Sequence, residues 1–180
     1  MAIRDIIFIP DPRLRQVCDP VTSDEFDDAL QTLIDDMFET MYHAPGVGLA
    51  ANQIGITKSL AVIDVVGSEQ PADQYVIINP KIIDSKGEVG MSAGCLSVPH
   101  QMIGTVKRAE WVKVAALDRF GNPIELEGDG LFGHCLQHEI DHLNGIVFVD
   151  RLSTLKRERM LAKIGKLDRL ITKQSTQDSQ

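Results

Sequence analysis

Two histidines and a glutamate in the segment "LFGHCLQHEIDHLNG", residues 131–145, have the spacing of a metal site. His138 and His142 are four residues apart, so on a helix their imidazoles lie one turn apart on the same face and can share one ion. Glu139 is adjacent to the first histidine and can accept a proton from a water that the metal holds. This spacing predicts a hydrolytic metal centre, which needs a third protein ligand and an open coordination position.

The third ligand cannot come from the same helix. His134 and Cys135 face roughly the same side, but a rise of about 1.5 Å per residue puts them about 12 Å and about 10.5 Å from His142 along the axis. Metal bonds to protein are only about 2.0–2.3 Å long. The candidates elsewhere in the chain are Cys95, Glu158, His43 and His100.

The residues alone leave the choice between these candidates open. Cys95 lies in "SAGCLSVP", residues 92–99, where a glycine and a proline indicate a tightly shaped segment. A lone cysteine is more often a core side chain than a ligand. Glu158 follows on the last predicted helix, and as third ligand it would make the chain an HExxH zinc metalloprotease.

The elements that must position these residues can be predicted from periodicity and from turn residues. They are a helix over 22–45 that begins with a capping box, strands over 59–66 and 74–83, a hairpin over 111–128, a helix from Asp129 to Asn144-Gly145, a strand over 146–149, and a C-terminal helix over about 153–172 with a frayed polar tail. The order predicts a single α+β domain over residues 1–180, in which mixed or antiparallel sheets pack around the central histidine helix.

Composition narrows the class of protein. The net charge of −8 argues against a general nucleic-acid binder, so we expect no DNA partner. The first residues are too charged for a signal peptide, and no apolar run approaches the length of a membrane span. Three widely spaced cysteines do not suggest a disulfide framework. We therefore expect a cytoplasmic protein without a membrane partner.

Three motifs together resemble those of peptide deformylases. They are "GVGLAANQ" at 46–53, "GCLS" at 94–97 and "QHEIDH" at 137–142, and the resemblance extends from "PDPRL" near the start to "VDRLS" before the last helix. In that family the motif cysteine and the two helix histidines bind the metal, which implies Cys95, His138 and His142 here. Ala93 departs from the family, which usually has a glutamate there beside the substrate pocket. This departure could leave Arg108 without its partner.

The resemblance implies removal of the formyl group from the formyl-methionine that begins new polypeptides, with release of formate. Glu139 would be the general base, and the side-chain amide of Gln53 and the backbone N–H of Leu96 would stabilise the oxyanion. One divalent ion is implied, Fe(II) in cells, with zinc, nickel or cobalt as alternatives. Gly46 and Gly48 would let the peptide backbone approach, and the predicted lining of an apolar methionine pocket is Val47, Val89, Leu131 and Cys135, with His134 at its edge.

The resemblance also implies a partner for the C-terminal helix. Lys and Arg side chains are concentrated between residues 151 and 173. Bacterial deformylases similar to this chain use this helix to dock near the ribosomal exit tunnel, although a solvated helix face is the simpler interpretation. Besides the metalloprotease, two alternatives stay open: an inactive ribosome-associated deformylase-like protein, and an enzyme for another N-formylated residue.

Overall fold

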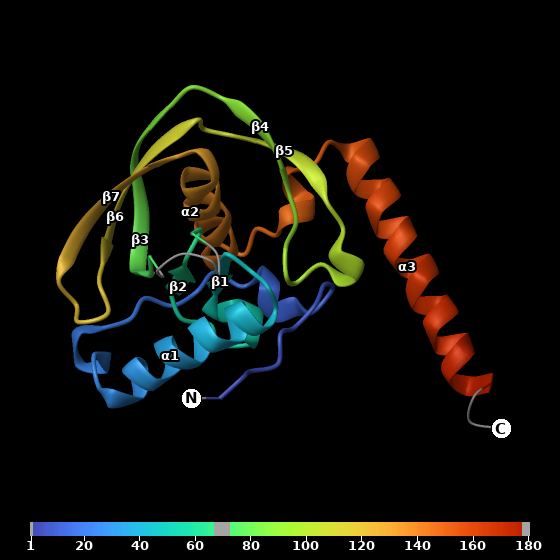
Figure 1. Cartoon of the computed structure of the whole chain (residues 1–180), viewed down its shortest axis with the longest axis horizontal. Coiled ribbons are helices and arrows are strands. Elements are labelled where there is room, and N and C mark those ends of the chain that lie inside the picture. Colours follow the sequence, from blue (N-terminus) through green and yellow to red (C-terminus); the bar gives the residue numbers. More distant parts are fainter. Residues whose placement is uncertain (1, 67–72, 178–180) are drawn as a thin grey trace.

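A computed structural model describes residues 2–66 and 73–177 of the chain (Figure 1). Its α-helices are α1 (Asp28–His43), α2 (Gly130–Leu143) and α3 (Thr154–Gln177). Its strands are β1 (Gly48–Ala50), β2 (Leu60–Ile63), β3 (Tyr75–Lys86), β4 (Val89–Ala93), β5 (Gly104–Arg108), β6 (Trp111–Leu117) and β7 (Pro123–Asp129). Short 3-10 helices are η1 (Pro12–Arg15), η2 (Ser23–Glu25), η3 (Ala51–Ile54), η4 (Pro99–Gln101) and η5 (Phe148–Arg151).

The described strands form two separate antiparallel sheets. One has the order β1-β2-β3-β6-β7, and the other is the two-stranded ribbon β4-β5. The pairing of the long strand β3 with β6 has register shifts between Ile78 and Lys81 and between Ile82 and Asp84. Such irregularities bend a strand and increase its twist. The predicted α+β fold with antiparallel sheets around a central histidine helix is confirmed.

The larger sheet is covered on both faces, and the alternation of side chains along β2 explains how. Ala61 and Ile63 belong to the apolar cluster that contains Leu136 and Ile140 of α2. Leu60 and Val62 belong to the cluster that contains the apolar face of α1. Because successive strand residues point to opposite faces, a continuous apolar run suits a strand buried on both sides. All four β2 residues are buried.

A third apolar cluster joins the ribbon to the C-terminal part of the chain. Its buried members are Leu14, Val98, Met102, Val106, Val147, Phe148, Val149, Leu152 and Ile164. In Figure 1 the ribbon arches over α2 toward α3, and the far end of α3 diverges from the rest of the chain. The ribbon is thus held by a different core from the one beneath α2.

The predicted start of the first helix at residue 22 is too early, because α1 begins at Asp28. Thr22 and Glu25 do form a reciprocal cap, with the Thr22 N–H donating to Glu25 Oε2 at 2.8 Å, but it belongs to the short helix η2. The α-helix begins later, where the Asp27 side chain accepts a hydrogen bond from the Leu30 N–H at 2.9 Å. The capping box was identified correctly and the helix start was wrong.

Predictions for the second half of the chain were mostly confirmed. The hairpin is β6-β7, and α2 starts after Asp129 and ends before Asn144 and Gly145, although the Asp129 side chain makes no capping hydrogen bond. The predicted strand over 146–149 is wrong, because Val147, Phe148 and Val149 are buried in the third cluster at the start of η5. The helix α3 continues past residue 172 to Gln177, and residues 178–180 of the predicted tail lie outside the described residues.

Candidate active site

The helix α2 is placed by direct contact with the strand before it. Strand β7 ends at Asp129 and α2 begins at Gly130, so no loop separates them. A Cβ atom at Gly133 would lie 2.5 Å from the carbonyl oxygen of Gly128, which shows that the first turn of the helix packs against the strand backbone. The sheet therefore fixes the direction in which the histidine side chains project.

Three potential metal ligands meet beside this helix. The ligand atoms of Cys95, His138 and His142 all lie within 4.8 Å of one another. The Cys95 Sγ is 3.1 Å from His142 Nε2. One thiolate and two imidazoles are a donor set that suits zinc and also ferrous iron. Among the described residues, this group has the composition and the geometry for one ion.

The protonation of these side chains is set mainly by burial. Burial lowers the pKa of His142 to about 4, and it lowers the pKa of His138 well below the usual value. Both imidazoles are therefore neutral at pH 7, which is the form that binds a metal. Burial raises the pKa of the Cys95 thiol to about 12, so this group has to release a proton when an ion binds.

The other candidate ligands lie elsewhere. Glu158 is exposed on α3, and His43 is exposed at the end of α1. His100 contacts Asp168 of α3, with 2.9 Å between Nε2 and Oδ1. The geometry that a metalloprotease would need at Glu158 is therefore not present.

Glu139 lies in the position expected of a proton acceptor. Its side chain is buried and lines the same cavity as Cys95 and His138, and its Oε2 atom has no hydrogen-bond partner among the described residues. Burial raises its pKa to about 8. A Cβ atom at Gly48 would lie 2.4 Å from Glu139 Oε1, so only glycine leaves room for the carboxylate here.

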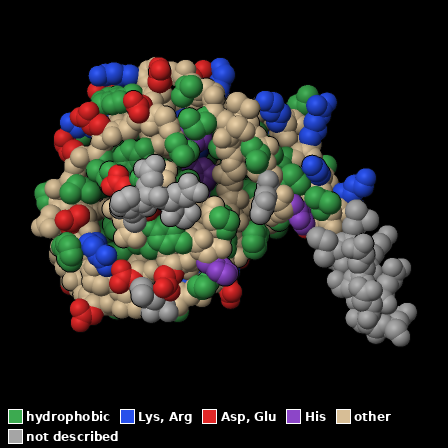
Figure 2. Space-filling view, viewed as in Figure 1, with side chains coloured by type: hydrophobic (Ala, Val, Ile, Leu, Met, Phe, Trp, Pro, Cys, Tyr) green, Lys and Arg blue, Asp and Glu red, His purple; other side chains and the backbone are tan. Residues whose placement is uncertain are grey.

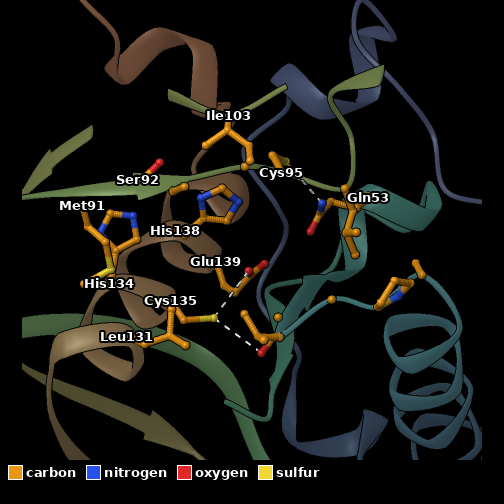
Figure 3. A pocket seen from close by; sticks show the side chains of 18 residues that line it. Gln53, Met91, Ser92, Cys95, Ile103, Leu131, His134, Cys135, His138 and Glu139 are labelled. Atoms are coloured by element: carbon orange, nitrogen blue, oxygen red, sulfur yellow. Dashed lines mark hydrogen bonds between the residues drawn. The ribbon is translucent and has the colours of Figure 1, made fainter. Parts of the chain in front are cut away.

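Gln53 directs its side-chain amide nitrogen toward Cys95, one of the three potential ligands. Its Oε1 accepts a hydrogen bond from the Ala50 N–H at 2.9 Å. Its Nε2 lies 3.7 Å from Cys95 Sγ and donates to Ser97 Oγ at 3.2 Å (Figure 3). Because the acceptor end of the amide is already used by the backbone, the donor end points toward Cys95 and Ser97. Leu96, which follows Cys95, lines the same cavity.

A cavity of about 430 Å³ surrounds these groups. Figure 2 shows it as a hollow in the molecular surface, with histidine visible in its depth. The predicted lining residues that the structure brings together here are Gly46, Val47, Gly48, Leu131, His134 and Cys135. Val89 is not among the lining residues, whereas Met91, Ser92, Ala93 and Ile103 are.

The position of Val89 on its strand explains this difference. Val89, Met91 and Ala93 alternate along β4 and so share one face of the ribbon. At about 3.3 Å per residue, Val89 lies roughly 13 Å from Ala93. The choice of Val89 identified the correct face and the wrong end of the strand. An alternation count back from Cys95 gives Ala93, Met91 and Val89 in turn, and only the distance along the strand separates Val89 from the other two.

Asp141 has a structural role that the sequence did not indicate. Its carboxylate is buried and accepts hydrogen bonds from Arg108 Nη1 at 2.6 Å and from Arg151 Nε at 2.9 Å. Arg108 therefore has a carboxylate partner even though Ala93 offers none. Its Nε and Nη2 atoms are nevertheless buried and lack a hydrogen-bond partner among the described residues.

Comparisons with known proteins agree with this geometry. The chain is similar to a solved peptide deformylase from Legionella pneumophila, with 56% identity, 95% of this chain and 98% of that chain covered, and a TM-score of 0.87. It is also similar to a peptide deformylase from Ehrlichia chaffeensis in complex with actinonin, with 40% identity, 94% and 99% covered, and a TM-score of 0.84.

A third similar structure is a class I type b peptide deformylase from Acinetobacter baumannii with Met-Ala-Ser bound. The identity is 34%, the match covers 84% of this chain and 99% of that chain, and the TM-score is 0.79. Within the part of the chain that the structure describes, no helix is both long enough and apolar enough to cross a membrane. The family model for polypeptide deformylase matches residues 3–158, and the chain therefore belongs to the polypeptide deformylase family.

Proposed function

We infer that this chain hydrolyses the N-formyl group of formyl-methionine at the start of newly made polypeptides, releasing formate and a free amine. The observation that carries this conclusion is the group of Cys95, His138 and His142 beside the buried carboxylate of Glu139, in a cavity of suitable size for one side chain. The Acinetobacter relative with Met-Ala-Ser bound supports it, because that peptide is the product of such a reaction.

Cys95, His138 and His142 would hold one divalent ion. The family is metal-dependent, and the donor set fits Fe(II), which we propose as the ion in cells, with zinc, nickel and cobalt as substitutes. Such an ion supplies a water that is acidic enough to lose a proton near neutral pH and so becomes a nucleophile for a stable amide. Oxidation of the Cys95 sulfur would remove a ligand, so we expect an iron-loaded sample to lose activity in air.

We propose that Glu139 moves the proton. The carboxylate accepts a proton from the attacking water and donates it to the leaving nitrogen, so that the amine departs neutral. A pKa raised by burial makes the carboxylate a stronger base than an exposed one. The free Oε2 atom leaves one oxygen available for this exchange.

We propose that Gln53 and Leu96 stabilise the negative charge on the former formyl oxygen. The Gln53 amide is fixed by its hydrogen bond from Ala50, so its donors are in place before the substrate arrives. The backbone N–H of Leu96 lies next to the metal ligand Cys95 in the chain. Donors that need no reorganisation during the reaction are the most effective kind.

The remaining lining residues would bind the substrate. Gly46 and Val47 precede β1 and Gly48 begins it, and glycine on this wall lets a peptide backbone come close. Leu131, His134 and Cys135 come from α2 on another wall. The wall is mainly apolar and accommodates a methionine side chain by burying its surface.

The direct test measures formate released from formyl-Met-Ala-Ser by anaerobically purified protein, with the metal content of the same sample determined. We expect turnover by the metal-loaded protein and none after Glu139→Gln at equal metal content. A metal-loaded wild-type protein that releases no formate would favour the inactive ribosome-associated alternative.

We further propose that the chain works in the cytoplasm and that α3 docks on the ribosome near the exit tunnel. The support is the concentration of basic side chains on this helix, which Figure 2 shows along its described part. The side chain of Lys173 lies outside the described residues. Electrostatic attraction to ribosomal RNA is the physical basis of the proposal.

A further inference from the structure

One polar side chain in the cavity wall has unused hydrogen-bonding groups. His134 lies on α2, its side chain is buried, and both ring nitrogens are buried without a hydrogen-bond partner among the described residues. Buried polar groups in proteins almost always have a partner, since leaving one unpaired is costly. An unpartnered imidazole in a substrate cavity therefore indicates a group that a ligand completes.

The neighbours of His134 cannot satisfy it. In Figure 3 its ring lies beside Met91, on the same side of the cavity as Leu131 and Cys135 and across from Gln53. Thioether and thiol groups are weak acceptors, and leucine offers none. Met91 is unbranched and flexible, so it can move aside when a ligand side chain enters.

The His134 ring is neutral and has one N–H to donate. Burial lowers the pKa of His134 to about 4, and the positive charge of Arg108 acts in the same direction. A neutral imidazole has one donor and one acceptor nitrogen. Neither ring nitrogen is engaged by another described side chain, so the N–H can be carried by either of them. An acceptor in the cavity then favours the tautomer that donates to it.

We propose that His134 extends the substrates of this chain to peptides that begin with N-formyl-methionine sulfoxide, by donating a hydrogen bond to the sulfoxide oxygen. This inference depends on the proposed deformylase function. Oxidation of methionine produces this side chain without changing its length, and its oxygen is a much stronger acceptor than the thioether sulfur. The formamide C–N bond is still hydrolysed to formate and amine, and the sulfoxide is neither oxidised nor reduced.

Two consequences distinguish this role from general packing. A sulfoxide sulfur is chiral, and a donor on one wall reaches the oxygen of only one epimer well. The same donor stays unpaired when norleucine fills the cavity, because that side chain has no acceptor. Replacing His134 by leucine should therefore lower kcat/KM for the sulfoxide substrate relative to kcat/KM for the norleucine substrate.

The experiment compares kcat/KM of the metal-loaded full chain for formyl-Met-Ala-Ser, formyl-norleucine-Ala-Ser and the two separated epimers of formyl-Met(sulfoxide)-Ala-Ser. In His134→Leu, we expect the ratio of the better epimer to norleucine to fall about tenfold, as the loss of one hydrogen bond implies. The preference between epimers should fall toward one. His134→Gln keeps an N–H donor and should retain most of both effects.

The outcomes separate the inference from the function on which it depends. Equal sulfoxide-to-norleucine ratios in wild type and His134→Leu would overturn the role of His134, even if formyl-Met-Ala-Ser is hydrolysed normally. Absence of formate from formyl-Met-Ala-Ser with wild-type protein would instead overturn the deformylase function.

A binding measurement covers the case in which His134→Leu fails to fold. In titration calorimetry of the wild-type protein, the better-bound epimer of Met(sulfoxide)-Ala-Ser should have an affinity similar to that of norleucine-Ala-Ser. The other epimer should bind more weakly. Binding of both epimers at least tenfold more weakly than norleucine-Ala-Ser would overturn the inference.

Discussion

The Cys95 sulfur lies 3.1 Å from the Nε2 atom of His142, and this contact distinguishes the deformylase from the metalloprotease interpretation. We expect Cys95→Ala to lower metal affinity more than about a hundredfold, because one of three protein ligands is lost. Metal content after dialysis measures the effect. Glu158→Ala, on the exposed face of α3, should leave the metal content unchanged.

Cys135 provides a matched control for this prediction. Its thiol is buried in the same cavity, 3.9 Å from Glu139 Oε1, but it does not belong to the ligand group. Cys135→Ala should therefore retain the ion. A loss of metal in Cys135→Ala equal to that in Cys95→Ala would contradict the ligand assignment.

Glu139 should lower the stability of the metal-free protein at high pH. Its pKa is raised from 4.5 to about 8 in the folded state, chiefly by burial, so folding disfavours its ionised form. For an acid with a raised pKa, stability is unaffected below about pH 4.5, falls as the pH rises to about 8, and then stays constant. Metal-free Glu139→Gln should be more stable than wild type by up to about 5 kcal/mol at pH 9.

Urea unfolding of metal-free protein at pH 4.5 and pH 9 tests this sign. We expect the wild type and Glu139→Gln to unfold alike at pH 4.5 and to differ at pH 9. A variant less stable than wild type at pH 9 would show that the carboxylate has compensating partners in the folded state. The same substitution should abolish deformylation. The Glu139 carboxylate would then be required for activity although it lowers the stability of the metal-free fold.

At the scale of elements, the buried Asp141 carboxylate ties α2 to the ribbon and to η5. Its partner Arg108 is on β5, and the side chain of Arg108 is only 4% exposed. Removing one member of a buried pair leaves the other charge unpaired, which typically costs about 3 kcal/mol or more. We expect this loss of unfolding free energy in Asp141→Asn, measured by chemical denaturation.

The exposed pair of Lys107 and Glu88 is the control for this prediction. These side chains are 75% and 64% exposed, and their nitrogen and oxygen atoms are 2.7 Å apart. Solvent screens such a pair, so Glu88→Gln should change stability by less than about 1 kcal/mol. A similar effect of the two substitutions would argue against a structural role for Asp141.

Comparison of the predicted and observed elements shows which sequence signals were sufficient to predict a helix or a strand. Periodicity predicted α2 and the hairpin β6-β7, because each buries one regular face. It failed for residues 146–149, where three consecutive apolar residues are buried at the start of the 3-10 helix η5 and pair with no described strand. Local hydrogen-bonding residues identified a cap at Thr22 but not the length of the element that it begins.

Sequence patterns likewise identified some residues of the candidate site and missed others. Ligand types and their spacing pointed to His138 and His142, and the resemblance of motifs supplied Cys95. The roles of Asp141 and of Met91 depend on contacts between segments distant in the chain, which no local pattern contains. Val89 was a plausible apolar choice, but only the length of β4 shows that it lies beyond the cavity.

At the scale of the whole molecule, charge is unevenly distributed. The chain has a net charge of −8, yet α3 carries exposed Lys156, Arg159, Lys163 and Lys166. If α3 binds ribosomal RNA, replacing several of these residues by glutamine should weaken ribosome co-sedimentation and reduce its salt dependence. Lys81→Gln combined with Lys86→Gln on β3 is a control of the same charge type. Unchanged ribosome binding after removal of residues 153–180 would contradict the proposal.

The organisation of residues 1–180 as a single domain also stays a prediction.

The division of the strands into two sheets has a consequence for motion. The histidines belong to the body formed by α2 and the larger sheet, whereas Cys95 follows the ribbon β4-β5, which has its own core. An ion bound by all three residues would link the ribbon to the unit formed by α2 and the larger sheet, and would restrict their relative motion. Hydrogen exchange should then accelerate in residues 89–108 when the ion is removed, while α2 keeps its protection. Equal acceleration of exchange in residues 89–108 and in α2 would mean that the ion stabilises the whole fold against unfolding. No acceleration would mean that apolar contacts alone hold the ribbon in place.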